Sequence, residues 1–297
     1  MRWQNRRRSS NIEDRRGQRA SGSNAGAAPL LRLLPMLLGS KGGKWVVLII
    51  GALFVASYLG VDIPFLSASG PSGQQSPAYQ PSAAEQELAE FTAVVLADTE
   101  ETWGRIFSEG GGQYQEPTLV MFSGAVNSAC GRAQSAMGPF YCPADRKVYI
   151  DLSFYQDLKN RHNAPGDFAQ AYVIAHEVGH HVQTLLGISP KVREQQARVS
   201  KAEANELSVR QELQADCFAG VWGYNANKFR DLLEPGDLQE ALVAASAIGD
   251  DRLQQEARGY ITPESFTHGT SQQRVAWFKR GFETGDMRQC DTFSAPI

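Results

Sequence analysis

The 297-residue chain has few of the residues that build small structural zinc sites. It contains four cysteines and five histidines, and no two cysteines show the CxxC spacing typical of zinc knuckles. The sequence also lacks internal repeats at any solenoid-like period. These absences argue against a zinc-knuckle protein and against a repeat array, and they leave one globular domain as the expectation for the folded part.

Positive charge is concentrated at the start of the chain. Residues 1–44 hold ten Lys or Arg against Glu13 and Asp14, a local charge of +8, whereas the remainder carries −11. A basic arm suits nucleic acid or anionic lipid, and the segment that follows it decides between the two. Because an apolar run follows the arm and the rest of the chain is acidic, we expect no nucleic-acid partner.

The apolar run from Trp45 to Val61 contains seventeen consecutive uncharged residues. That length is the lower limit for a helix that crosses a bilayer core of about 30 Å. The basic residues before it predict a cytoplasmic N-terminus. We therefore expect a transmembrane signal-anchor at 45–66 and a single-pass protein of the inner (cytoplasmic) membrane with an exported catalytic domain. The alternatives are a cleaved signal peptide, for which Leu66 to Gly70 offers small residues, and a buried core helix.

Composition predicts four segments. Residues 1–44 form a basic, disordered cytoplasmic arm, 45–66 the anchor, 67–81 a Pro/Ser/Gly linker and 82–297 the folded domain. Export would permit disulfides. Cys130 and Cys142 are close enough in sequence to staple a loop, whereas Cys217 and Cys290 either pair or remain free.

The folded domain shows mostly helical patterns. Ser82 and Glu85 form a capping-box pattern before a helical run, and a second helix is expected from Asp167 to Leu186, where Gly187 ends it. The strand candidates are Thr118–Phe122 and Lys147–Leu152, and later helices are expected near 204–225, 237–248 and 271–280. The fold class is therefore α+β, predominantly helical with a small β-sheet.

The helix expected from Asp167 carries the sequence His176-Glu177-Val178-Gly179-His180. Residues four apart on a helix project from the same face, so His176 and His180 can share one metal ion. Two neutral imidazoles suit Zn2+, which acidifies a bound water, and Glu177 can accept the proton of that water as a general base. The spacing therefore predicts a zinc hydrolase site, with two ordinary helical histidines as the alternative.

The third ligand separates the classes of zinc peptidase. A metzincin would have glycine and histidine where this chain has Gln183 and Leu186, which excludes that class. Glu212 lies on a later helix, and Asp216 follows it on the same face and can accept the second N–H of a liganding histidine. We therefore expect metal ligands His176, His180 and Glu212 with Asp216 behind them. Glu194, Glu203 and Glu206 are the competing carboxylates, and they lack an acidic residue four positions later.

The motifs together resemble the bacterial family of putative neutral zinc metallopeptidases, with a gluzincin-like arrangement of ligands. The similarity rests on Gly138–Pro143, Val148–Asp151, His176–Gln183, Glu212–Cys217, Thr267–Ser271, Arg274 and Trp277–Phe278. The resemblance covers nearly the whole chain from the basic arm onward. It implies a zincin-like fold and a zinc cofactor.

The resulting hypothesis is a membrane-anchored zinc endopeptidase that hydrolyses peptide or protein substrates with Glu177 as general base. His268 is the candidate donor to the oxyanion, because related peptidases recruit a downstream histidine or tyrosine; the alternative is a histidine that caps the helix from Ser271. His181 is expected to make a supporting or packing contact. Val148–Leu152 could bind substrate as an edge strand, and the alternative is a buried central strand. The alternative function is a membrane-tethered, non-catalytic zinc-binding scaffold of the cell envelope.

Overall fold

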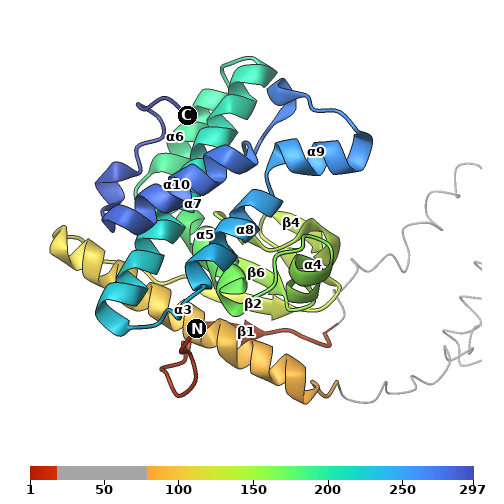
Figure 1. The fold of residues 1–297 in the computed structure, drawn as a ribbon, viewed down its shortest axis with the longest axis vertical. Helices are drawn as coiled ribbons and strands as arrows, with labels where there is room; N and C mark the ends of the chain where they lie inside the picture. The colour runs from red at the N-terminus through yellow and green to blue at the C-terminus, as the bar shows by residue number, and fades with distance from the viewer. Residues whose placement is uncertain (19–78) are drawn as a thin grey trace, which may run out of the picture. The chain divides into compact units, whose positions relative to one another are not determined.

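A computed structural model of the chain describes residues 1–18 and 79–297. Helices dominate this part of the chain, and a small sheet lies beside them, as the sequence predicts (Figure 1). The strands are β1 (Ile12–Asp14), β2 (Thr118–Phe122), β3 (Ala125–Ser128), β4 (Gly131–Gln134), β5 (Phe140–Cys142) and β6 (Lys147–Asp151). The α-helices are α3 (Ala83–Glu109), α4 (Phe154–Asn160), α5 (Asp167–Leu185), α6 (Ile188–Gln196), α7 (Lys201–Arg230), α8 (Asp237–Ala247), α9 (Asp250–Arg258) and α10 (Ser271–Thr284).

Side-chain caps fix the starts of the longest helices. Ser82 accepts a hydrogen bond from the backbone of Glu85 and forms the predicted capping box at the start of α3. Ser200 and Glu203 make the same arrangement at α7, and Thr270 and Gln273 make it at α10. Each box satisfies backbone N–H groups that the first helical turn would leave unpaired.

The larger sheet has the strand order β1-β2-β6-β5. β1, β2 and β6 are parallel, whereas β5 pairs antiparallel with β6 and forms one edge. Of the two alternatives for Val148–Leu152, an edge strand or a buried central strand, the structure shows the central strand, because β6 lies between β2 and β5. The available edge belongs to Phe140–Cys142, which is too short to show a period of its own.

Residues 1–18 are packed onto the domain. β1 pairs with β2, and the backbone N–H of Leu119 donates to the carbonyl of Asn11 at 2.8 Å. The Met1 ammonium lies 2.9 Å from the Asp167 carboxylate at the start of α5. Residues 1–18 and 80–297 thus belong to one compact unit, and this part of the predicted arm is not disordered.

The predicted membrane topology is corrected by these findings. Within residues 1–18 and 79–297, no helix combines the length and the apolar character needed to cross a membrane. The predicted span, 45–66, lies outside the described residues. The predicted single-pass topology also placed the arm and the catalytic domain on opposite sides of the inner membrane. Because β1 pairs with β2, the two cannot be separated in that way, and the predicted localisation is wrong.

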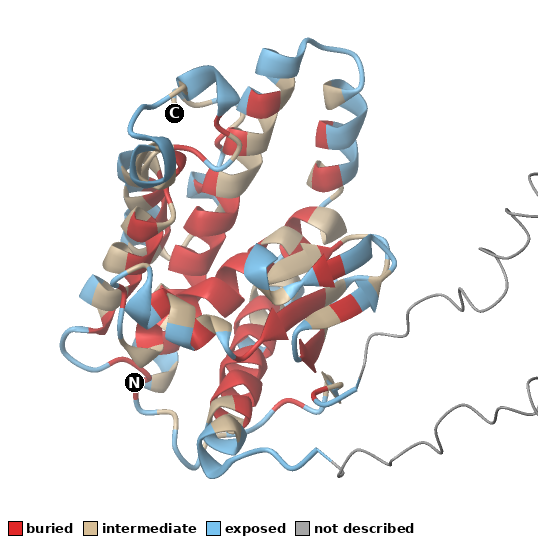
Figure 2. Ribbon diagram, turned by 90° about the vertical axis from the view of Figure 1, so that its right-hand side faces the viewer, coloured by how far each residue is buried: buried red, intermediate tan, exposed pale blue. Residues whose placement is uncertain are grey.

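Helices α5, α7 and α10 pack together at the centre of the domain, and Figure 2 shows buried residues along the central helices and the sheet. α7 and α10 approach through glycines: a Cβ on Gly281 would lie 1.9 Å from the Cys217 carbonyl oxygen, and one on Gly220 would lie 2.1 Å from that of Phe278. Only glycine permits backbones to come this close. The crossing brings α10 side chains to the face of α7 that meets α5.

Candidate metal centre

The paired histidines project from the middle of α5. His176 and Glu177 are buried, and the rings of His176 and His180 lie with centroids 4.8 Å apart. The helix begins where the Phe168 backbone N–H donates to Glu240 at 3.0 Å, and it ends before Gly187, whose φ of 73° suits glycine. The two imidazoles therefore share one face of a well-bounded helix.

Glu212 of α7 lies opposite these histidines. Its carboxylate oxygens are 3.1 Å from His176 Nε2 and 3.3 Å from His180 Nε2. One ligand atom from each of the three residues falls within 4.8 Å of the other two. The competing Glu194 and Glu206 instead form surface ion pairs with Arg198 and Arg210. The structure thus brings together the three predicted ligand residues.

Asp216, one turn after Glu212, is fully buried behind His176. Its carboxylate accepts from His176 Nδ1 at 2.8 Å, from the Tyr172 hydroxyl at 2.5 Å and from Arg274 Nε at 2.8 Å. Burial alone would raise the pKa of Asp216, but the Arg274 guanidinium and His176 lower it to about 2. An ionised Asp216 fixes the Nδ1–H tautomer of His176 and directs Nε2 toward Glu212.

The pKa values of His176, His180 and Glu212 are shifted toward the charged forms by neighbouring groups of opposite charge. Burial disfavours the protonated imidazoles, yet Asp216 and Glu212 raise the pKa of His176 to about 10, and Glu212 raises that of His180. Burial likewise disfavours the Glu212 carboxylate, but the two imidazoles hold its pKa well below the ordinary value. Two imidazoles and a carboxylate that converge in this way form a donor set that suits zinc.

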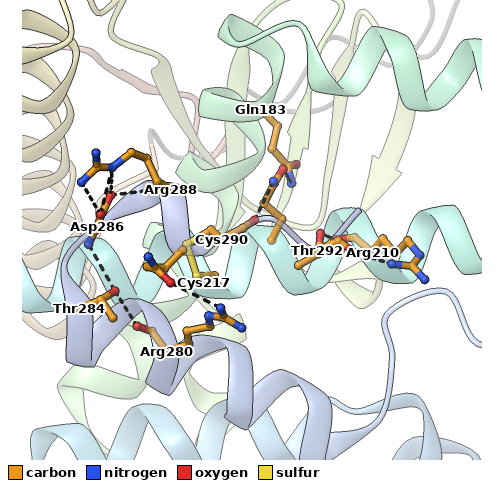
Figure 3. The surroundings of a disulfide bond; sticks show 11 residues. Gln183, Arg210, Cys217, Arg280, Thr284, Asp286, Arg288, Cys290 and Thr292 are labelled. Carbon is orange, nitrogen blue, oxygen red and sulfur yellow. Dashed lines mark hydrogen bonds and ion pairs between the residues drawn. A yellow bond between two sulfur atoms is a disulfide. The ribbon is translucent and has the colours of Figure 1, made fainter. Parts of the chain in front are cut away.

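A chain of amides orients His180. His180 Nδ1 lies 2.9 Å from Gln183 Oε1, and the Gln183 amide donates to Gln214 at 3.1 Å. Gln214 in turn donates to the carbonyl of Cys290 at 2.9 Å. Cys290 forms a disulfide with Cys217, the residue after Asp216, as Figure 3 shows. Sequence reasoning missed Gln183 as a support for His180, although its position three residues later was an available signal.

Two cavities meet at this centre. The larger, about 540 Å³, is lined by His176, Glu177 and His268, and the smaller, about 270 Å³, by residues of α6. Tyr141, His180 and Glu212 line both. The Glu177 carboxylate has no hydrogen bond or ion pair to any residue in the described part of the chain. It is therefore free to accept a proton from a molecule in the larger cavity.

His268 is held at the wall of the larger cavity by Asp250. The Asp250 carboxylate accepts from the backbone N–H of His268 at 2.6 Å and lies 3.3 Å from its ring Nδ1. The hydrogen bond to Asp250 raises the pKa of His268, against the effect of burial. Thr270 caps α10, so the alternative role of His268 as the cap is not the one observed.

His181 makes only supporting contacts. It is buried, and its ring nitrogens lie 3.1 Å from the Tyr141 hydroxyl and 2.6 Å from the carbonyl of Gln115. Burial lowers the pKa of His181 to about 4. A neutral His181 links α5 to the edge strand β5.

Two disulfides tie the domain together. Cys130 pairs with Cys142, which confirms the predicted stapled loop, and the bridge connects the turn between β3 and β4 with β5. Cys217 pairs with Cys290, which resolves the alternative that the sequence left open.

The family that matches the chain is described as one of zinc metallopeptidases, which agrees with the donor set of this centre. The family described as "Putative neutral zinc metallopeptidase" matches residues 1–293. The chain is 56% identical over 297 residues to "Uncharacterized protein YpfJ" of Escherichia coli strain K12, with all of both chains covered. It is 48% identical over 192 residues to "Uncharacterized protein Rv2575" of Mycobacterium tuberculosis, which covers 61% of this chain and 64% of the relative. No solved structure matches. The chain belongs to the family of putative neutral zinc metallopeptidases.

Proposed function

We propose that the protein is a zinc-dependent endopeptidase with His176, His180 and Glu212 as metal ligands. The observation that carries the proposal is that these three side chains converge and line the larger cavity. The Glu177 carboxylate, which has no hydrogen bond or ion pair within the described residues, lines the same cavity. A purely structural zinc site uses four closed ligands and needs no free base beside them. The free Glu177 therefore favours the enzyme over a non-catalytic zinc-binding scaffold.

When bound, zinc would supply a Lewis acid and an acidified water molecule. Glu177 accepts the proton of the attacking water and delivers it to the leaving amine, the role of a general base and then a general acid. Asp216 keeps the His176 tautomer fixed throughout, and Gln183 does the same for His180. The residues of this chain thus provide proton transfer and a rigid ligand set.

His268 completes the proposed mechanism. With its pKa raised by Asp250, the ring carries a proton more readily than a free imidazole. A protonated ring at the wall of the larger cavity can donate to the oxyanion that forms on the scissile carbonyl. His268 is accordingly proposed as a catalytic donor and Asp250 as the residue that positions it.

The edge strand β5 is proposed to bind the substrate backbone. Phe140 and Tyr141 lie on β5 and line the cavity that contains Glu177. One side of β5 pairs with β6, and its other side has no strand partner within residues 1–18 and 79–297. An extended peptide added to this side would cross the metal centre.

The test combines zinc analysis with peptide cleavage, using wild type and Glu177→Gln. We expect one zinc per chain in both proteins and cleavage by the wild type alone, with a loss of at least about 100-fold in kcat. Glu206→Gln, a surface change on α7, serves as the matched control and should cleave normally. A zinc-free wild type, or a fully active Glu177→Gln, would contradict the proposal.

A further inference from the structure

The two cavities continue the active-site cleft on both sides of the metal centre. They share Tyr141, His180 and Glu212, so the proposed scissile bond would lie where they meet. β5 contributes residues to both cavities, and a peptide that pairs with β5 would place side chains in each. The lining of each cavity can therefore select the residues on the corresponding side of the bond.

The larger cavity has an apolar section in its wall, beside the polar residues of the metal centre. Six side chains from different elements give it this character: Met137, Phe140, Phe154, Val173, Ile248 and Leu253. Arg161 and Asp157, which also line this cavity, form an ion pair at 3.6 Å, so their charges offset one another. A volume of about 540 Å³ is ample for a leucine or phenylalanine side chain. Apolar burial therefore favours a large hydrophobic residue on this side.

The smaller cavity differs in chemistry. Thr184, Ser189, Gln196 and Gln211 give it a polar wall, and Arg193 of α6 adds a positive charge. Several of these polar groups bond to one another or to the backbone: Gln196 donates to the Ala204 carbonyl at 3.0 Å and Gln211 donates to Ser189 at 3.3 Å.

Arg193 is the exception in this wall. Within the described residues its guanidinium has no ion pair, although Arg198, five residues later, pairs with Glu194 at 2.6 Å. Arg193 is exposed, so it can bind a ligand without first breaking an existing ion pair. An unpaired guanidinium beside a polar cavity is suited to a carboxylate.

We propose that Arg193 makes the smaller cavity a subsite for acidic residues, so that the preferred substrate carries Asp or Glu on one side of the scissile bond and a large apolar residue on the other. This inference rests on the proposed peptidase function and specifies its substrate class. It assigns Arg193 and the apolar wall as determinants of specificity, apart from the groups that perform the chemistry.

Matched peptides test the proposal on the full-length zinc-loaded protein. They carry Glu or Gln on one side of the central bond and Leu on the other, in both orders. For the order that the protein cleaves faster, we expect kcat/KM to favour Glu over Gln by about fivefold. That ratio corresponds to the free energy of a solvent-accessible ion pair. Arg193→Gln should bring this ratio close to one, and Arg193→Glu should transfer the preference to a Lys peptide. Lys191→Gln, an exposed charge change on the same helix, should leave the ratio unchanged.

Binding supplies a readout independent of turnover. In Glu177→Gln, fluorescence anisotropy of the labelled peptides should show the same Glu preference, reduced at high salt because screening weakens an exposed ion pair. Leu253→Ala should weaken the preference for Leu over Ala without altering that for Glu over Gln. If the protein cleaves peptides but Arg193→Gln leaves the ratio of kcat/KM for Glu and Gln peptides unchanged, this inference is overturned and the peptidase proposal stands. A zinc-loaded wild type that cleaves no peptide would overturn the peptidase proposal and this inference with it.

Discussion

Asp216 is the residue on which the orientation of the metal centre depends most. It bonds to His176, Tyr172 and Arg274, and neither it nor Arg274 is more than 2% exposed at the side chain. Removal of one member of a buried charge pair leaves the other without compensation, at a cost of about 3–5 kcal/mol. Asparagine at this position would keep an amide oxygen but lose the negative charge that strengthens the hydrogen bond from His176 Nδ1.

Asp216→Asn should therefore impair both stability and metal binding. We expect a loss of about 3 kcal/mol in the free energy of unfolding and a 10- to 100-fold decrease, roughly, in zinc affinity. Urea titration and competition with a chelator measure the two effects. Asp286→Asn, which removes a surface pair with Arg288, is the control and should change neither. Zinc affinity equal to wild type in Asp216→Asn would show that the carboxylate does not position His176.

His268 should determine the alkaline side of the activity profile. Its pKa is raised by Asp250, so the protonated donor persists above the ordinary imidazole pKa of 6.5 and is lost as the pH rises through the raised value. Asp250→Asn removes the carboxylate and should shift this loss of activity to lower pH. The measurement is kcat as a function of pH.

His268→Gln provides the control for that assignment. A neutral amide can still donate but does not titrate, so the variant should be slower and its profile should lack this alkaline step. An alkaline step that stays at the same pH in Asp250→Asn would assign it to another group.

At the scale of helices, the crossing of α7 and α10 sets the distance between Arg274 and Asp216. A methyl group at Gly281 would collide with the backbone of Cys217, which cannot move as a flexible side chain could. Gly281→Ala must therefore separate the helices and withdraw Arg274 from the metal centre.

We expect Gly281→Ala to lower the free energy of unfolding by more than about 2 kcal/mol, within the range for overpacked sites. Gly104→Ala in α3 is the matched control, because no atom outside the local helix lies within 4 Å of the added carbon. That change should stabilise the protein by up to about 1 kcal/mol, since alanine favours helix more than glycine. Equal stabilities of the two variants in thermal unfolding would contradict this view of the crossing.

Local sequence signals predicted the long helices but not the shortest strands. Helices with local signals were found: the capping box at Ser82 and the glycine at 187 mark ends that neighbouring residues determine. β1 and β5 were missed because each has three residues and exists only through pairing with a distant strand. Likewise, the i, i+4 spacing placed His176 and His180 on one face, whereas the amide chain through Gln214 depends on tertiary contacts that no local pattern records.

At the scale of the whole molecule, the Cys217–Cys290 disulfide joins the C-terminal segment to the helix that carries Glu212 and Asp216. It spans 73 residues, and closing a loop of that length stabilises a fold by about 4 kcal/mol in the chain-entropy treatment. The carbonyl of Cys290 also receives the hydrogen bond of Gln214 that leads, through Gln183, to His180.

Cys217→Ser/Cys290→Ser should therefore lower the Tm by about 10 °C and weaken zinc binding. Cys130→Ser/Cys142→Ser is the comparison, because its loop spans 12 residues and it lies outside the hydrogen bonds that lead to His180. We expect a smaller decrease in Tm and unchanged zinc affinity for that pair. If both double substitutions change zinc affinity equally, the hydrogen bonds that lead from Cys290 through Gln214 and Gln183 to His180 do not contribute to zinc binding.

The N-terminal segment is the other long-range contribution to stability. Glu100 of α3 is buried, and its carboxylate bonds to Arg7 at 2.9 Å, to Asn11 at 2.9 Å and to Ser9. A protein that lacks residues 1–18 would lose β1 and these partners, and the side of α3 that carries Glu100 would be opened to water. We expect such a protein to lose roughly 3 kcal/mol or more of unfolding free energy, about 1 for each lost hydrogen bond to Glu100 and the rest from β1.

Glu100→Gln distinguishes the charge from the missing strand. In the full chain the substitution should destabilise, because it removes the ion pair with Arg7. In the protein without residues 1–18 it should change the free energy of unfolding by less than about 0.5 kcal/mol, because Glu100 then faces water and has no ion pair to lose. A destabilising effect in the full chain alone, measured by urea unfolding in a double-mutant cycle, would show that residues 1–18 act as part of the folded domain. A stabilising or neutral effect in both backgrounds would mean that these residues do not hold Glu100 in the folded protein.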